Sequence, residues 1–142
     1  MNPTIEKFGY PATLVREFQH WLLLLRPAQV TLGSLVMAAK SEATAFADLP
    51  REAFAEQADV VAAVEAALDR FTGYERINYL MLMMVDLNVH FHVIPRYAEP
   101  RSWNGLEFPD TGWPGPPRLD HAVALNREQL GLLATEVAAN LR

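Results

Sequence analysis

The stretch Asn88-Val-His90-Phe-His92-Val-Ile-Pro-Arg96 decides how this sequence is interpreted. A β-strand has a side-chain period of two, so Asn88, His90, His92 and Ile94 are expected to share one face of a strand. The apolar residues between them then face the other way. Imidazole can act as a nucleophile, an acid or base, or a metal ligand near neutral pH. A row of such groups on an otherwise apolar strand predicts a functional site.

Apolar runs rich in strand-forming residues predict three strands early in the chain, over residues 13–18, 21–26 and 34–38. The first two are expected to form a hairpin that turns near Gln19-His20. A further strand is predicted over residues 76–85, and Asp86-Leu87 is the expected short link to the histidine strand, residues 88–94. A link that short predicts an antiparallel hairpin.

Two helices are predicted. The first begins near Pro50 and ends at Gly73, and its apolar stripe is expected to consist of Phe54, Val61, Val64, Leu68 and Phe71. The second covers about residues 126–141, where Asn126 and Gln129 have the spacing of a capping box. The sum is an α+β fold: a mainly antiparallel sheet of about five strands, with one long helix packed on it and a C-terminal helix.

Composition fits one domain over residues 1–142, with a core at about residues 12–97 and a Pro- and Gly-rich irregular arm at residues 98–119. The net charge of −5 argues against a nucleic-acid partner. The absence of cysteine excludes disulfides and cysteine zinc sites. No apolar run is long enough to cross a membrane, and the first residues lack a signal-peptide core, so we expect a cytoplasmic protein.

The pattern Asn88-x-His90-x-His92 resembles the signature of the histidine triad (HIT) family, His-φ-His-φ-His-φ-φ, in which φ is apolar. The expected order of strands and the long helix is also similar to the HIT core. The tail Val93-Ile94-Pro95-Arg96 and the segment 26–36 look like parts of other members. The resemblance covers about residues 21–97 and implies a HIT-like fold.

The resemblance implies a nucleotide phosphohydrolase or nucleotidyl transferase. His90 matches the histidine that attacks the α-phosphorus and forms a nucleotidyl-histidine intermediate, and His92 matches the one that binds the phosphate or adjusts protonation. Expected substrate-binding residues are Asn88, Ser34, Arg96, Arg26 and Lys40. The implied partner is a small nucleotide and the implied assembly is a homodimer, joined through the long helix and a strand. We expect no cofactor.

Three departures from the family pattern favour an alternative, a protein that binds a nucleotide or another phosphate ligand without turnover. The first signature position is Asn88, whose amide cannot shuttle a proton near pH 7. The segment Thr31-Leu32-Gly33-Ser34 replaces a Pro-Gly-His sequence of many members. The expected link Asp86-Leu87 is shorter than the phosphate-contacting loop of many members.

A zinc site is a further, less favoured alternative. Two histidines two residues apart can supply two zinc ligands, and a catalytic zinc site needs a third protein ligand. Asp86, His20 and His121 are candidates for that ligand, but none has a persuasive spacing from the pair. We therefore expect no metal.

Overall fold

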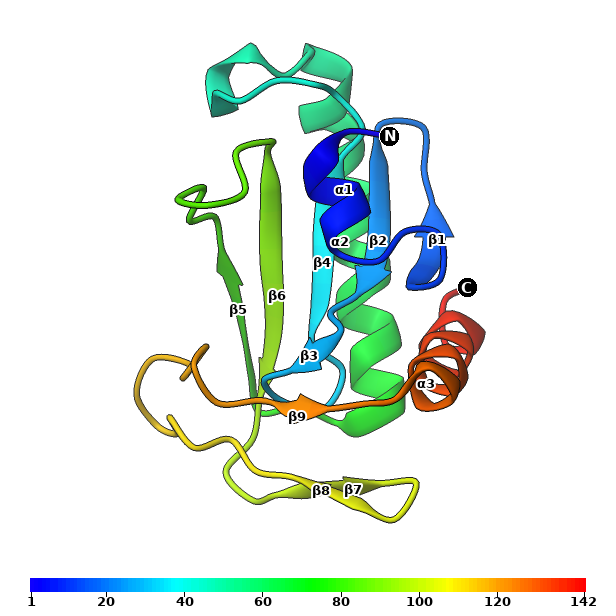
Figure 1. Cartoon of the computed structure of the whole chain (residues 1–142), viewed down its shortest axis with the longest axis vertical. Helices are drawn as coiled ribbons and strands as arrows, with labels where there is room; N and C mark the ends of the chain where they lie inside the picture. Colours follow the sequence, from blue (N-terminus) through cyan, green and yellow to red (C-terminus); the bar gives the residue numbers. More distant parts are fainter.

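The computed structural model describes all residues, 1–142, and contains one five-stranded antiparallel sheet. Its strands lie in the order β1-β2-β4-β6-β5, as Figure 1 shows. Their bounds are β1 Leu14–Glu17, β2 Trp21–Leu25, β4 Leu35–Ala39, β5 Arg76–Leu80 and β6 His90–Arg96. The predicted α+β class is confirmed, as is the hairpin between β1 and β2.

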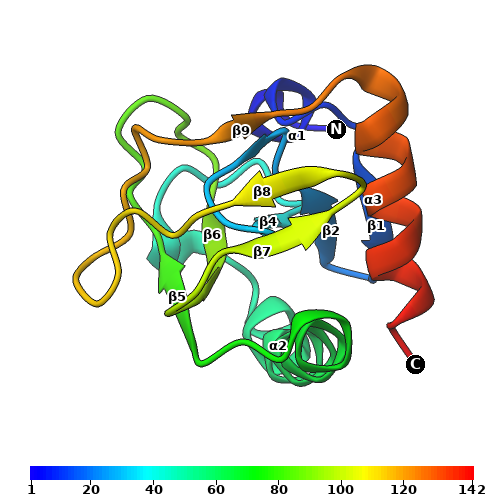
Figure 2. The same cartoon turned by 90° about the horizontal axis from the view of Figure 1, so that it is seen from below.

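Two longer helices complete the predicted framework. Helix α2, Arg51–Thr72, lies along one face of the sheet and ends where Gly73 adopts a left-handed conformation with φ of 61° (Figure 2). Helix α3, Arg127–Ala139, packs against β1, β2 and α2. Its predicted capping box, formed by Asn126 and Gln129, is confirmed. Neither helix is long and apolar enough to cross a lipid bilayer, and the same holds for the short ones.

Several short elements lie around this framework. They are α1 Pro3–Lys7, the 3-10 helix η1 Phe46–Asp48, and the short strands β3 Ala28–Gln29, β7 Arg101–Trp103, β8 Leu106–Phe108 and β9 Val123–Ala124. Strand β3 pairs with β9, and β7 pairs with β8. Helix α1 was not predicted from the sequence, although Asn2 caps it and Pro3 is its first residue, a combination typical of helix starts.

The two faces of the sheet are buried very differently. The face toward α2 belongs to a cluster of 21 buried apolar residues, which is the main core. The opposite face carries a cluster of only five, namely Ile5, Leu22, Leu24, Val36 and Ala38. Ile5 comes from α1, which therefore covers part of this second face (Figure 1). The histidines of β6 lie on this less filled face, because their partners Ala38 and Val36 belong to it.

The predicted apolar stripe of the long helix is partly wrong. The residues of α2 that are buried are Ala53, Val60, Val64, Ala67 and Leu68. Phe54 is 40% exposed and packs its ring on Phe46 at 5.4 Å. The prediction was based on the largest side chains. A helix that packs closely on a sheet also buries small residues such as alanine against it. Two of the five buried positions are alanines for this reason.

The predicted strand over residues 76–85 is too long, because β5 ends at Leu80. The residues after Leu80 have no strand to pair with. Strand β6 starts at His90, and the two residues just before it form hydrogen bonds with other parts of the chain. Val89 accepts from Ala39 and donates to Ala43, and the Asn88 N–H donates to Thr4. The link between β5 and β6 is therefore residues 81–89, so the expected two-residue link, and the short loop inferred from it, are wrong.

The predicted irregular arm, residues 98–119, contains a regular hairpin. Strands β7 and β8 pair directly, and Asn104 and Gly105 between them have φ of 52° and 77°. Positive φ at both central residues is the requirement of a tight two-residue hairpin turn, and Asn-Gly is its strongest sequence signal. That signal is present in the sequence, but the prediction of an irregular arm was based on the surrounding prolines and glycines.

Candidate active site

His90 and His92 come together on the face of β6 that lies opposite α2. Their ring centroids are 5.2 Å apart and the rings are nearly perpendicular, at 79°. Phe8, just after α1, contacts both rings at centroid distances of 5.6 and 5.7 Å. Only 2% of His90 and 7% of His92 is exposed. The predicted pairing of the two histidines is therefore observed, and the first residues of the chain form its cover.

The tautomer of His90 is set by the main chain. Its Nδ1 lies 2.7 Å from the carbonyl oxygen of Asn88. A carbonyl oxygen can only accept a hydrogen bond, so Nδ1 carries the proton and Nε2 keeps its lone pair. Neutral imidazole with a free Nε2 is the form that acts as a nucleophile.

His92 has the opposite tautomer. The Nε–H of Arg26 donates to Nδ1 of His92 at 3.3 Å, so the proton of His92 is on Nε2. Burial is the largest cause, with the charges of Arg26 and His90 acting in the same direction against an opposing effect of Asp86, and together they lower the pKa of His92 to about 4. His92 is therefore neutral near pH 7 and donates from Nε2. The site combines one imidazole lone pair with one imidazole N–H.

The side chain of Asn88, expected to bind substrate, is used inside the protein. Its Oδ1 accepts from the hydroxyl of Thr4 at 3.1 Å, and its Nδ2 donates to the carbonyl of Glu42 at 3.0 Å. Asn88 is 7% exposed. It fixes α1 to the start of β6, and its contact with His90 is made by its main-chain carbonyl. The amide of Asn88 therefore bonds to Thr4 and Glu42 and makes no hydrogen bond to either histidine ring.

Three other expected substrate-binding residues lie in different parts of the structure. Arg26 lies beside His92, and burial lowers its pKa. Ser34 is fully buried, and its hydroxyl bonds only to Thr31 in the same turn. Lys40 pairs with Glu17 at 2.6 Å, at the end of the sheet next to β1. Of these three, the structure brings only Arg26 to the histidines.

Arg96, the fifth expected substrate-binding residue, is engaged in a buried ion pair. Its guanidinium bonds both carboxylate oxygens of Asp110, at 2.7 and 3.0 Å, and the two side chains are 4% and 1% exposed. Arg96 lies four positions after His92 on the same strand face, about 13 Å away at strand spacing. Arg96 therefore does not join the histidine pair and ties the arm to the sheet.

A flap, residues 81–87, covers the other side of the histidine pair. Five of its residues, Leu82 to Asp86, line a cavity of about 150 Å³ with His90 and His92. No main-chain hydrogen bond holds the flap to the rest of the protein. Asp86 forms an ion pair with Lys7 of α1 at 2.8 Å, and Met84 at the tip is 82% exposed. The flap is thus held by side chains alone, namely the Asp86 ion pair and the packing of Met81 and Met83 against the main core.

The residues suggested as a third zinc ligand do not complete a metal site. No group of three or more histidine or acidic side chains in the structure could hold a metal ion. Asp86 lines the histidine cavity, but its carboxylate is paired with Lys7. The expectation of no metal stays a prediction.

Phe8, Thr4 and the flap are the parts of the site that the sequence analysis missed. Phe8 and Thr4 are about 80 positions from the histidines, so no local pattern connects them. Their one signal was the Asn2-Pro3 helix start. The flap was hidden because its apolar residues, Leu82 to Val85, resemble a strand.

Several solved structures that share this backbone are histidine triad proteins. One from Sinorhizobium meliloti superimposes with a TM-score of 0.76 at 21% identity, over 99% of this chain and 96% of that chain. One from Bradyrhizobium japonicum gives 0.71 at 14% identity, over 100% and 97%. A hypothetical histidine triad nucleotide-binding protein from Sulfolobus tokodaii gives 0.69 at 18%, over 96% and 88%.

These likenesses define the fold of the protein. The chain has the histidine triad fold, and the predicted HIT-like architecture is confirmed. No protein-family model and no curated protein sequence matches it. The expected homodimer and cytoplasmic location stay predictions.

Proposed function

We propose that this protein is a HIT-like nucleotide phosphohydrolase or nucleotidyl transferase, with His90 as the nucleophile that attacks an α-phosphate. The observation that carries the proposal is the hydrogen bond from Nδ1 of His90 to the Asn88 carbonyl, 2.7 Å long, which leaves Nε2 with a lone pair. The fold shared with histidine triad proteins supports the same function, including the nucleotide-binding protein named above.

In the first step, Nε2 of His90 forms a bond to the α-phosphorus, and the bond from phosphorus to the leaving-group oxygen breaks. The electron pair of that bond leaves with the oxygen. The imidazole becomes positively charged, and the Asn88 carbonyl that accepts from Nδ1 stabilises that charge. The Nε2–H of His92, whose ring lies 5.2 Å from that of His90, and the guanidinium of Arg26 beside it then donate to the charge that develops on the phosphoryl oxygens.

In the second step, a water oxygen attacks the phosphorus and the phosphorus–nitrogen bond breaks. Its electron pair returns to Nε2 of His90, one proton of the water passes to solvent, and the nucleotide is released. An acceptor alcohol or amine in place of water gives transfer instead of hydrolysis. Covalent catalysis of this kind divides one difficult displacement into two easier ones.

The site favours substrates with good leaving groups. His92 is neutral near pH 7, because its pKa is about 4, and the amide of Asn88 is not acidic. Neither group can protonate a departing oxygen. We therefore expect turnover of phosphoanhydrides, such as dinucleoside polyphosphates and adenylyl sulfates, whose leaving groups are stable anions.

Binding requires the flap to move. The cavity beside the histidines is about 150 Å³, whereas pockets for ligands of nucleotide size are about 300–1,000 Å³. Since α1 is anchored by the fully buried Ile5 and the flap has no main-chain hydrogen bonds to the rest of the protein, the flap is the element that opens.

A binding protein without turnover is the second candidate. It is favoured by the use of the Asn88 side chain inside the protein and by the apolar character of the flap, which brings no side-chain donor to a phosphate. Calorimetry with nucleoside monophosphates addresses it. Micromolar binding without turnover would support it, and no binding of any nucleotide would exclude both candidates.

The decisive experiment compares the wild type with His90→Ala and His90→Gln on dinucleoside polyphosphates, nucleoside phosphoramidates and adenylyl sulfates. We expect turnover of at least one class by the wild type and its loss in both variants. Mass spectrometry of wild type quenched and kept at alkaline pH, where the phosphorus–nitrogen bond is stable, should show a nucleotidyl adduct on His90. Equal, background-level turnover by all three proteins would overturn the enzymatic proposal.

A further inference from the structure

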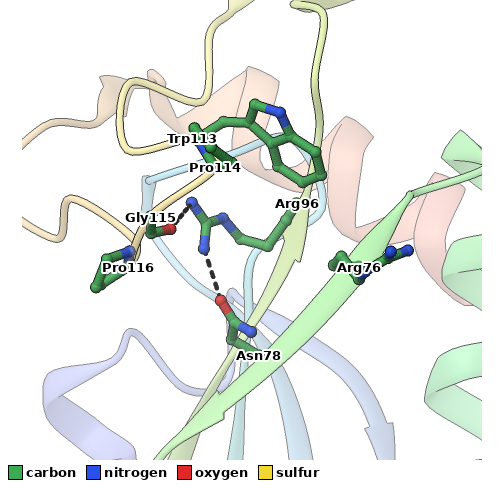
Figure 3. A pocket seen from close by; sticks show the side chains of 7 residues that line it. All are labelled: Arg76, Asn78, Arg96, Trp113, Pro114, Gly115 and Pro116. Carbon is green, nitrogen blue, oxygen red and sulfur yellow. Dashed lines mark hydrogen bonds between the residues drawn. The ribbon is translucent and has the colours of Figure 1, made fainter.

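A second cavity, of about 480 Å³, lies at the opposite end of β5 and β6 from the histidine pair. It is lined by Arg76 and Asn78 of β5, Arg96 of β6, and residues 113–116 of the arm (Figure 3). The pairing of Leu80 with His92 and of Arg76 with Arg96 puts these positions on the same sheet face. None of these residues is used by the proposed reaction.

Arg96 holds the floor of this cavity in place. Its guanidinium bonds the Asp110 carboxylate, the Oδ1 of Asn78 at 2.7 Å and the carbonyl of Gly115 at 2.9 Å, as Figure 3 shows for the last two. The side chain of Asp110 is 1% exposed and also accepts from the N–H of Tyr97. Arg96 therefore occupies the acceptor oxygens of Asn78, Gly115 and Asp110, and it neutralises the charge of the Asp110 carboxylate.

The side-chain groups that remain without a partner inside the protein are donors. The Oδ1 of Asn78 is held by Arg96, and its Nδ2 amide group has no acceptor in the protein. The indole N–H of Trp113 has none either. Arg76 is exposed, donates only to the main-chain carbonyl of Glu75, and forms no ion pair. A cavity whose lining carries an unpaired amide NH₂ and an unpaired guanidinium matches an anion.

The walls of the cavity suit a flat apolar group. Trp113 presents an indole ring, and Pro114 and Pro116 have no N–H groups (Figure 3). Aromatic rings stack favourably on indole, and a volume of about 480 Å³ is in the range of pockets for small organic ligands. A bare inorganic ion would use little of this surface.

We propose that this cavity is a binding site for a small aromatic anion, a ring that carries a phosphate or a carboxylate. The anion binds the amide of Asn78 and the guanidinium of Arg76, and the ring packs on Trp113 and the prolines. The site is separate from the histidine pair and does not depend on the proposed reaction.

The test is a titration of the full chain with phenyl phosphate, followed by calorimetry and by the fluorescence of Trp113. We expect saturable binding, with inorganic phosphate about tenfold weaker because it lacks the ring, and no binding of the neutral analogue phenol. Trp113→Phe should remove the fluorescence change. Benzoate tested beside phenyl phosphate distinguishes a carboxylate ligand from a phosphate ligand.

Two variants identify the site. Asn78→Asp keeps the oxygen that accepts from Arg96 but replaces the free amide with a carboxylate, and should abolish anion binding by repulsion. Arg76→Gln removes an exposed charge and should weaken binding about tenfold, the effect of one charge-assisted hydrogen bond. Arg51→Gln, which removes an exposed arginine at the start of α2, is the matched control and should bind as the wild type does.

His90→Ala separates this proposal from the proposed function. Its binding of phenyl phosphate should be unchanged even though its turnover of nucleotides is lost. The proposal is overturned if phenyl phosphate gives no saturable signal, if Asn78→Asp and Arg76→Gln bind it as the wild type does, or if His90→Ala abolishes binding.

Discussion

The main-chain carbonyl of Asn88 lies 2.7 Å from Nδ1 of His90, while the Asn88 side chain turns away to Thr4 and to the carbonyl of Glu42. One residue thus has two separate tasks. Its backbone sets the tautomer of His90, and its amide joins α1 to the start of β6. A change of its side chain should therefore act mainly on stability and leave the tautomer in place.

We predict that Asn88→Ala lowers the free energy of unfolding by about 1–3 kcal/mol, because the buried hydroxyl and N–H of Thr4 lose their acceptor. Urea unfolding measures this. A double-mutant cycle with Thr4→Val should show a coupling energy of about 0.5 kcal/mol or more between the two side chains. The ¹⁵N shifts of His90 should still report a protonated Nδ1. A changed tautomer at unchanged stability would contradict the division of tasks.

His92 should remain neutral across the physiological range. Its pKa is about 4 in the folded protein and about 6.5 in an unfolded chain. The unfolded chain therefore binds more protons between these values, so the stability that neutral His92 contributes is complete above about pH 6.5 and is lost as the pH falls toward 4. NMR titration should show no protonation of His92 from pH 8 to 5.5. His92→Gln should flatten the fall in stability below pH 6.5.

Arg26→Gln should raise the pKa of His92, because it removes the cation that opposes imidazolium formation beside Nδ1. Burial of the ring persists, so the pKa should stay below that of a free histidine. The same NMR titration measures the change. Arg127→Gln, an exposed arginine at the start of α3, is the control and should leave the His92 titration where it is. An unchanged His92 titration in Arg26→Gln would show that burial alone sets the pKa.

Asp86→Asn should loosen the flap. The Lys7–Asp86 pair joins the flap to α1, and exposed ion pairs contribute only about 0–1 kcal/mol, so the global stability should hardly change. Access to His90 should increase several-fold, measured as its rate of modification by diethyl pyrocarbonate, with the exposed His121 as an internal reference. Lys40→Gln breaks another ion pair, with Glu17 of β1, the edge strand opposite β5, and serves as control. Equal rates at His90 in all three proteins would contradict the flap assignment.

Asp110→Ala should destabilise the protein by about 3–5 kcal/mol, since it leaves the buried guanidinium of Arg96 without its carboxylate. Thermal or urea unfolding measures this. Asp120→Ala provides a matched comparison, because Asp120 pairs with Arg118 on the surface and its loss should leave stability unchanged. A small effect at both positions would show that the arm is not held to the sheet by Arg96.

Sequence periodicity was sufficient for the framework. The alternation around His90 and His92, the capping box at Asn126 and the glycine at position 73 each depend on neighbouring residues only, and each prediction was confirmed. The resemblance of the strand to the histidine triad signature added the correct fold. Two local signals were not recognised, because the residues around them favour another structure. The Asn104-Gly105 turn lies in a segment rich in proline, and the apolar flap has the composition of a strand.

By itself the sequence determined that two histidines share a strand face in a HIT-like α+β fold, because side-chain period and capping are properties of adjacent residues. Only the tertiary structure decided what surrounds them. Phe8 covers the pair, Arg26 fixes the tautomer of His92, and Asn88 faces Thr4. In the tertiary structure Ser34 bonds to Thr31, Lys40 pairs with Glu17 and Arg96 pairs with Asp110, so none of the three contacts the histidine pair. These outcomes depend on contacts between residues far apart in the chain, which no periodic pattern encodes.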